Sequence, residues 1–322
     1  MARVLLAALI AGVLLAGGSA NGAVRKGDGP TTIATGYGSV WVGTGSGSVL
    51  RIDPRRRRVV QRIKIYGFVH DLVPAYGSIW VSSGTAVLQR IDPATGRVRE
   101  IWSRDLWTVT AVAVSAGRVW ILDGAHRQLR RIDPARNRID EKVGIPAGEP
   151  LWLWADPSHL WLQVNTDPKP PLVEDDLAHV RLIALDPVTG LPLGPAVETA
   201  GWIRFSAGFG SLWATDQIAR TLARIDPSSG STVATRSGVV SIVAPVPGFG
   251  SLWLPDGATL RRLDPESLAT VAAVEAPGSA VAVGSGAVWL LGNGGGTRGT
   301  VTKVDPRTNR VVGRPIPIVP KP

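Results

Sequence analysis

The chain contains seven copies of one short pattern, and this repetition restricts its fold more than any other feature. Each copy has an apolar segment, a turn that contains Gly in six of the seven copies, an apolar-Trp-apolar segment, a second turn and then an apolar-Asp-Pro sequence. Successive repeat tryptophans lie 36 to 52 residues apart. The repeat tryptophans are Trp41, Trp80, Trp120, Trp161, Trp213, Trp253 and Trp289, and the paired aspartates are Asp53, Asp92, Asp133, Asp186, Asp226, Asp264 and Asp305. Seven copies with two fixed anchors each indicate a structural repeat.

Each copy holds four short segments with the character of β-strands. In the first copy they are residues 31–35, 39–43, 48–52 and 59–65, which are rich in Val and Ile and bounded by Gly, Pro and Asp. None of the copies has the periodicity of a helix. Repeats of four strands stack radially, so the sequence predicts an all-β protein, a seven-bladed β-propeller of four-stranded antiparallel blades. We expect residues 24–322 to form this single domain.

Packing explains the residues that recur in every copy. A Trp on the second strand fills the wedge between adjacent blades with a large apolar surface. The Asp-Pro pair opens the turn before the fourth strand, because the carboxylate accepts turn N–H groups and proline presets φ. Six copies also carry a cation two residues before the Asp, and we expect it to pair with a carboxylate or stack on a Trp ring. These cations are Arg51, Arg90, Arg131, Arg224, Arg262 and Lys303.

The first 23 residues have the character of a secretory signal peptide. Arg3 is followed by an unbroken run of small and apolar residues over 4–18, and small residues come next. This run is shorter than the roughly 20 residues that span a bilayer. We therefore expect cleavage near residue 23, no transmembrane span afterwards, and a secreted or otherwise extracytoplasmic location. An uncleaved anchor is the alternative.

Composition narrows the chemistry. The absence of cysteine excludes disulfides, thiol catalysis and zinc-finger sites. Removing Arg3 with the signal leaves 34 basic and 25 acidic residues, a net charge of +9. Such a charge attracts an anionic wall polymer, and the run Arg55–Arg58 is its densest local concentration. An exported chain is not expected to bind nucleic acid, and we expect a monomer.

The motifs Gly-Phe-Gly-Ser-Leu-Trp at 208–213 and Arg-Ile-Asp-Pro-Ala-Thr-Gly at 90–96 carry a family likeness. They resemble exported bacterial propellers of the YVTN type and the virginiamycin B lyase (streptogramin lyase) group. The resemblance implies a propeller from about residue 31 to 318. For the lyase group it also implies ring opening of a cyclic depsipeptide by elimination with a divalent metal such as Mg²⁺. That chemistry is carried by histidines at the inner strands of late blades and by a glutamate three residues after a repeat Trp.

This chain departs from that catalytic pattern. The corresponding segments 202–204, 242–244 and 278–280 contain no histidine, and Gly292 stands three residues after the last repeat Trp. Of the four histidines, only His70 lies where an inner strand begins. We therefore assign no catalytic residue and expect no cofactor. If the protein is an enzyme, His70 and Asp71 are the candidates, and only then is a metal such as Mg²⁺ expected.

Residues that break the sevenfold symmetry are the best candidates for a binding site. Nine residues before each repeat Trp stand Thr32, Asp71, Ala111, Trp152, Arg204, Ala244 and Ala280. Most are small, but Asp71, Trp152 and Arg204 are not, and Trp107, Trp154 and Trp202 lie near the same segments. Copy four also carries an acidic, Pro-rich insertion at 165–177, since its Trp-to-Asp distance is 25 residues against 11 to 16 elsewhere.

These observations predict a ligand cleft over copies two to five. Trp107, Trp152 and Trp202 are expected to form its aromatic floor, Asp71 and Arg204 its polar anchors, and 165–177 its rim. Alternatively, the tryptophans fill gaps between imperfect blades and the insertion is a tolerated surface loop. No metal site is expected, and we interpret Asp123, Asp216 and Asp256 as turn-capping residues.

The sequence therefore predicts an exported, non-enzymatic propeller that binds a protein or cell-envelope ligand through one face of its ring. The alternative is a virginiamycin B lyase-like or hydrolytic enzyme with a rearranged site on that face. A purely structural interaction module is the third possibility.

Overall fold

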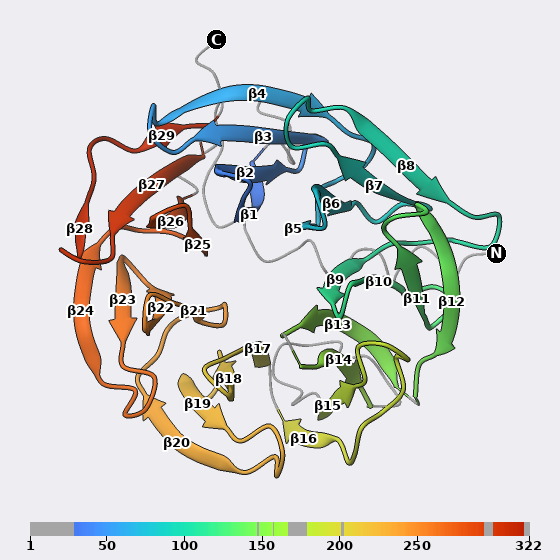
Figure 1. Ribbon diagram of the computed structural model, residues 1–322. Helices are drawn as coiled ribbons and strands as arrows, with labels where there is room; N and C mark the ends of the chain where they lie inside the picture. Colours follow the sequence, from blue (N-terminus) through green and yellow to red (C-terminus); the bar gives the residue numbers. More distant parts are fainter. Residues whose placement is uncertain are drawn as a thin grey trace, which may run out of the picture.

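The computed structural model describes residues 29–146, 148–156, 158–166, 179–200, 203–292 and 299–318. These residues form seven antiparallel sheets arranged in a ring, a seven-bladed β-propeller without helices in the described part (Figure 1). No helix among the described residues is long and apolar enough to cross a membrane. The signal-peptide prediction for 1–23 lies outside the described residues, so it stays a prediction.

Each blade is built from strands that follow one another in the chain. Blade one contains β1 (Pro30–Gly36), β2 (Ser39–Thr44), β3 (Ser48–Asp53) and β4 (Arg58–Lys64). Blade two contains β5 (Asp71–Ala75), β6 (Ser78–Ser82), β7 (Val87–Ile91) and β8 (Val98–Trp102). Blade three contains β9 (Ala111–Ser115), β10 (Arg118–Asp123), β11 (Gln128–Asp133) and β12 (Arg138–Gly144). The strands of blade one match the sequence prediction to within one or two residues.

The remaining blades repeat this order. Blade four contains β13 (Glu149–Ala155), β14 (Leu160–Asn165), β15 (His179–Leu185) and β16 (Val197–Ala200). Blade five contains β17 (Ile203–Gly208), β18 (Ser211–Asp216), β19 (Thr221–Ile225) and β20 (Thr232–Ser237). Blade six contains β21 (Val246–Gly248), β22 (Ser251–Asp256), β23 (Thr259–Leu263) and β24 (Thr270–Glu275). Blade seven contains β25 (Ala280–Gly284), β26 (Ala287–Gly292) and β27 (Thr300–Asp305), with an outer strand split into β28 (Arg310–Val311) and β29 (Ile316–Pro317).

The up-and-down order of the strands gives the ring two distinct faces. The first strand of each blade lies nearest the centre, and the fourth strands run along the rim (Figure 1). The loops that lead into the inner strands, together with the loops between second and third strands, form what we call the top face. The turns between first and second strands and the Asp-Pro turns form the bottom face. The predicted site residues therefore belong to the top face, and the four-arginine turn belongs to the bottom.

The repeat tryptophans fill the wedges between blades, as the sequence predicts. All seven are fully buried. Each belongs to an apolar cluster that includes residues of the following blade: Trp41 packs with Ile79 and Val81 of blade two. Trp289 of blade seven packs with Val40 and Val42 of blade one, so the same contact closes the ring.

The six repeated cations fasten each blade to its neighbour. Every one of them stands over its own repeat Trp, with the Arg90 guanidinium 4.9 Å from the centroid of the Trp80 ring. Five of the six also donate a hydrogen bond to a carbonyl in the Asp-Pro turn of the next blade, as Arg90 does to Pro134 over 2.7 Å. The predicted stacking on Trp is confirmed, and the bond to the next blade is an additional finding.

Two tyrosines strengthen adjacent joints on the bottom face. The Tyr37 hydroxyl accepts hydrogen bonds from the N–H groups of Gly77 and Ser78 in the next blade, over 2.7 and 3.2 Å. The Tyr76 hydroxyl accepts one from Gly117 in the same way. Tyr37 has a φ of 51°, a conformation that is costly for an aromatic residue. The turn therefore directs its side chain across the joint.

Candidate functional site

The symmetry-breaking residues occupy equivalent positions in the ring. In register, Asp71 pairs with Ser82, Trp152 with Gln163 and Arg204 with Thr215, and each partner follows its repeat Trp by two residues. Thr32, Ala111 and Ala280 stand in the same register in their blades. The structure therefore carries these three larger side chains at the top of the inner strands of blades two, four and five.

Arg204 and Trp152 are in direct contact across the joint between blades four and five. The Arg204 guanidinium lies 5.2 Å from the centroid of the Trp152 ring. Burial lowers the pKa of Arg204, yet the described residues give it neither an ion pair nor a hydrogen-bonded carboxylate. A register shift between Pro150 and Trp152 bends the strand at this point, and the Trp152 side chain remains 37 % exposed. The pair thus places a cation and a partly exposed aromatic ring together on the top face.

Asp71 is the acidic counterpart on the other side of the top face. Its side chain is partly buried, and burial raises its pKa to about 6 although the N–H of Leu72 donates to Oδ1 over 2.8 Å. Among the described residues no cation pairs with it. A carboxyl group with a burial-raised pKa in the wall of a channel is a typical feature of a functional site. Its described hydrogen bond is to Leu72, not to Trp152 or Arg204, so the three residues form two separate anchors.

His70 and Asp71 are neighbours in the chain, and His70 makes its described contacts elsewhere. The His70 ring packs on Phe68, with centroids 5.0 Å apart, and burial lowers its pKa. Its backbone N–H donates to Ser82, and the described contacts include no hydrogen bond from its ring to Asp71. The assignment of these two residues as candidates, if the protein is an enzyme, stays a prediction.

Trp107 lies on the top face over blade three, away from the Trp152–Arg204 pair. Its ring is 58 % exposed and rests on His126, with centroids 5.7 Å apart. His126 Nδ1 lies 2.9 Å from Oδ2 of Asp123, which also accepts a 2.7 Å hydrogen bond from the buried Arg130. Arg130 in turn holds Asp105, just before Trp107 in the chain. A buried charge network that sequence reasoning missed therefore fixes the loop that carries Trp107.

The other predicted features have different outcomes. Trp154 stacks on Phe205 at 5.9 Å and joins the core between blades four and five, so its gap-filling interpretation is confirmed. Trp202 and residues 167–177 of the insertion lie outside the described residues. The aromatic floor and rim of the predicted cleft therefore stay predictions in those parts.

The second-strand aspartates cap loops, as we interpreted them. Asp216 accepts the N–H groups of Ile218 and Ala219 over 2.8 Å, and Asp256 accepts that of Val240 over 2.7 Å. Asp123 does the same for Thr108. Across the described ranges no three His, Asp or Glu side chains come together as a metal-binding group. The expectation that the protein has no metal site stays a prediction.

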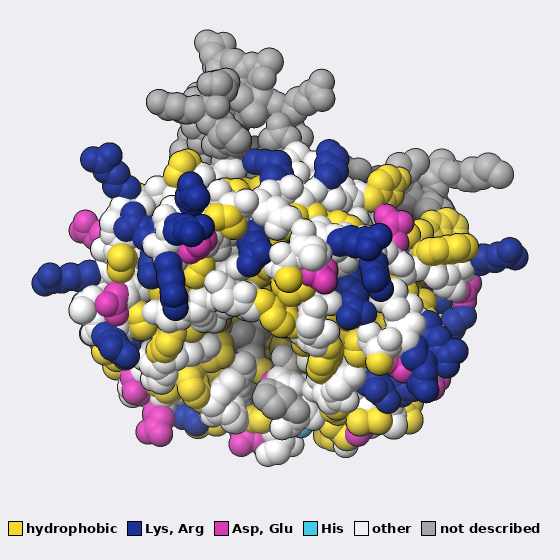
Figure 2. Space-filling model, turned by 45° about the horizontal axis from the view of Figure 1, so that its top comes forward, with side chains coloured by type: hydrophobic (Ala, Val, Ile, Leu, Met, Phe, Trp, Pro, Cys, Tyr) yellow, Lys and Arg dark blue, Asp and Glu magenta, His cyan; other side chains and the backbone are white. Residues whose placement is uncertain are grey.

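Basic side chains are numerous on the face shown in Figure 2. Lys and Arg side chains stand at many points of the face in Figure 2, with acidic and apolar side chains between them. In the four-arginine turn, Arg57 donates to the carbonyl of Arg314 in blade seven, and Arg56 lies 3.8 Å from Asp53. Arg57 therefore helps to join blade one to blade seven, where the ring closes.

Comparisons with known proteins support the fold alone. No family model matches the chain, and no curated protein matches it. Among solved structures it is similar to the computationally designed Ika8 protein, with a TM-score of 0.63 and 12 % identity over 89 % of this chain and 86 % of that one. It is also similar to the dihydro-heme d1 dehydrogenase NirN in complex with DHE, with a TM-score of 0.59 and 15 % identity over 91 % of this chain and 66 % of that one. These findings do not confirm the YVTN or virginiamycin B lyase resemblance.

Proposed function

We propose that the protein acts outside the cytoplasmic membrane as a non-enzymatic binding propeller that takes a protein or cell-envelope ligand on its top face. The observation that carries this proposal is the pair of unpartnered ionisable groups at equivalent positions of the inner strands. Burial shifts the pKa of both Arg204 and Asp71 toward the neutral form, and no described side chain of opposite charge pairs with either of them. A ligand with an anionic and a hydrogen-bonding or cationic group would offset both.

The ring supports binding rather than catalysis at this site. Its two anchors stand on inner strands of a rigid scaffold, and arginine and tryptophan are the residues most enriched in binding hot spots. The candidate base His70 packs on Phe68 instead of on a reacting group. Propellers commonly present such a face to their partners, although the fold alone does not specify a ligand.

The test is affinity capture from the envelope fraction of the source organism with the mature protein. The comparison is a variant with Asp71, Trp152 and Arg204 replaced by alanine, selected for unchanged thermal stability. A matched control replaces Arg55 and Arg56 with alanine on the bottom face. We expect a partner that the wild type and the control retain and the triple variant loses. Equal retention by all three proteins, or loss only in the arginine control, would refute the proposal.

A further inference from the structure

Blade two carries a second, unassigned surface on the rim of the ring. Its outer strand β8 ends in Trp102, whose side chain is 65 % exposed. Tyr66 follows the outer strand β4 of blade one and is 67 % exposed, more than any other large apolar or aromatic side chain described. On the other described outer strands the exposed apolar side chains are valines, namely Val60, Val233, Val271 and Val311. Two exposed aromatic rings at one joint are therefore a local feature of blade two.

The chain holds Tyr66 in place through a buried side chain. The Gln89 amide accepts the N–H of Tyr66 over 2.8 Å and donates to its carbonyl over 2.7 Å. Gln89 itself is almost completely buried. A side-chain amide that bonds both the N–H and the carbonyl of one residue fixes the backbone of that residue. The exposed Tyr66 ring is therefore attached to a rigid backbone position.

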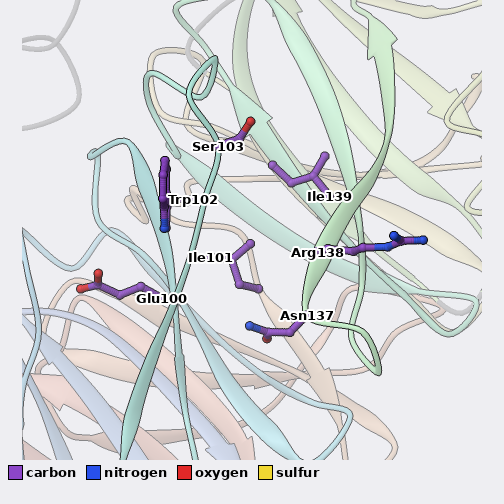
Figure 3. Close-up of a pocket in the computed structure, with 7 residues that line it drawn as sticks. All are labelled: Glu100, Ile101, Trp102, Ser103, Asn137, Arg138 and Ile139. Carbon is purple, nitrogen blue, oxygen red and sulfur yellow. The ribbon is translucent and has the colours of Figure 1, made fainter.

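A groove runs between Tyr66 and β8. It has a volume of about 550 Å³ and is lined by Lys64, Ile65, Tyr66, Gln89, Val98 and Glu100. Trp102 lines a neighbouring cavity of about 310 Å³, which is the one drawn in Figure 3. Trp102 shares a face of β8 with Glu100 because residues two apart in a strand point the same way. Figure 3 shows both side chains projecting to one side of the strand, while Ile101 and Ser103 project to the other, toward blade three. Glu100 lines both cavities, so it links the one that Tyr66 lines to the one that Trp102 lines.

We propose that this groove binds a neutral saccharide chain. A pyranose ring has a flat C–H face, which packs on an indole or phenol ring, and hydroxyl groups at its edge that need both donors and acceptors. The two rings provide the flat surfaces, and Glu100 and Lys64 provide an acceptor and a donor of opposite charge. That balance favours a neutral ligand over a polyanion. An apolar peptide anchor would instead require an enclosed apolar pocket, which this open groove does not supply.

The spacing of the groups suits an extended ligand. Glu100 and Trp102 are two residues apart on β8, which corresponds to about 7 Å along the strand. Tyr66 extends the surface into the preceding blade. A chain of several sugar units thus covers both rings, whereas a monosaccharide contacts only one. This site shares no residue with the proposed top-face site, so either can exist without the other.

Calorimetric titration of the mature protein with chitotetraose and with cellotetraose tests the proposal. We expect at least one of them to bind with a dissociation constant of about 1 mM or tighter. Trp102→Ala is expected to weaken that binding about tenfold, and Glu100→Gln by a smaller factor. The matched control Val271→Ala removes an exposed apolar side chain from the outer strand of blade six and is expected to bind as the wild type does.

Three outcomes would overturn the inference. The first is no saturable binding of either oligosaccharide by the wild type up to about 10 mM. The second is binding that Trp102→Ala leaves unchanged. The third is binding whose affinity falls steeply as the salt concentration is raised. Salt screens interactions between charges, so it should not affect a neutral ligand, and such a fall would indicate that the groove selects an anionic polymer. Trp102 is exposed, so its replacement tests the groove without disturbing the core.

Discussion

Replacing Asp71 with asparagine removes a carboxyl group whose pKa burial raises to about 6 in the folded protein. The ordinary value of 3.8 applies in the unfolded chain, so the shift is about two pKa units. Each unit corresponds to about 1.4 kcal/mol, which makes the cost of ionising this group in the folded state up to about 3 kcal/mol. The direction follows from burial, since desolvation disfavours the charged carboxylate.

The sign of the pH dependence follows from proton uptake. Between about pH 4 and pH 6 the folded state binds more protons at Asp71 than the unfolded state does. This group therefore stabilises the wild type most at low pH, and the contribution disappears as the pH rises through 6, the folded-state value. Asp71→Asn keeps the shape and stays neutral. We expect the variant to be more stable than the wild type at about pH 7.5, by up to about 3 kcal/mol, and to lose this advantage near pH 4.

Urea unfolding followed by tryptophan fluorescence measures this difference, because all seven repeat tryptophans are buried in the native ring. Asp92→Asn is the matched control with the opposite sign. Hydrogen bonds from the N–H groups of Thr95 and Ala94 lower the pKa of Asp92, so its stabilising effect is present above pH 4 and lost in acid. A difference between Asp71→Asn and the wild type that is constant from about pH 4 to pH 8 would refute the reasoning.

Substitutions at three further positions test two joints between blades and the charge network of blade three. Arg90→Ala should lower the free energy of unfolding by about 2 kcal/mol in urea titrations, because it removes the stacking on Trp80 and the bond to Pro134. Arg90→Lys should restore only part of this, and full restoration would contradict the role of the guanidinium. Tyr37→Phe should lower the free energy of unfolding by about 1 kcal/mol in the same titration, because the N–H groups of Gly77 and Ser78 lose the hydroxyl that accepts their hydrogen bonds. An unchanged free energy would mean that water replaces this hydroxyl as the acceptor. Asp123→Asn should lower the free energy of unfolding by about 3 kcal/mol and shift Trp107 emission, since it removes the buried carboxylate of Arg130 and leaves only the partly exposed Asp105; unchanged emission would separate the loop from the network.

The repeats made the architecture predictable because each anchor has one physical role. A buried Trp in each wedge and an Asp-Pro turn before each outer strand determine strand order and blade number together. The cations two residues before the Asp were correctly expected to stack on Trp. Their bonds to the next blade were not predicted, because those bonds depend on how the blades sit against each other.

The candidate site was predictable only where symmetry is broken within the repeat itself. Asp71, Trp152 and Arg204 could be found by alignment, and the contact between the last two followed once the blades were placed. The rim groove was missed because Trp102 and Tyr66 belong to no repeated position. Trp102 is one of only five tryptophans outside the repeat, and this was the signal that the sequence offered. Its exposure became visible only in the structure. Arg130 and Asp123 were missed as a pair because charged residues seven apart on separate strands give no pattern.

No described strand crosses from one blade into another, so the joint between blades seven and one is formed by side chains and backbone surfaces like the other six. Thr35 donates to Val283, and Lys303 donates to the Pro54 carbonyl, in the place where a shared strand would otherwise lock the ring. A circular permutant opened in any loop between blades, with the native ends joined, retains every sheet intact. The same property makes each blade a self-contained unit that can pair its strands as it leaves the ribosome, before the ring exists.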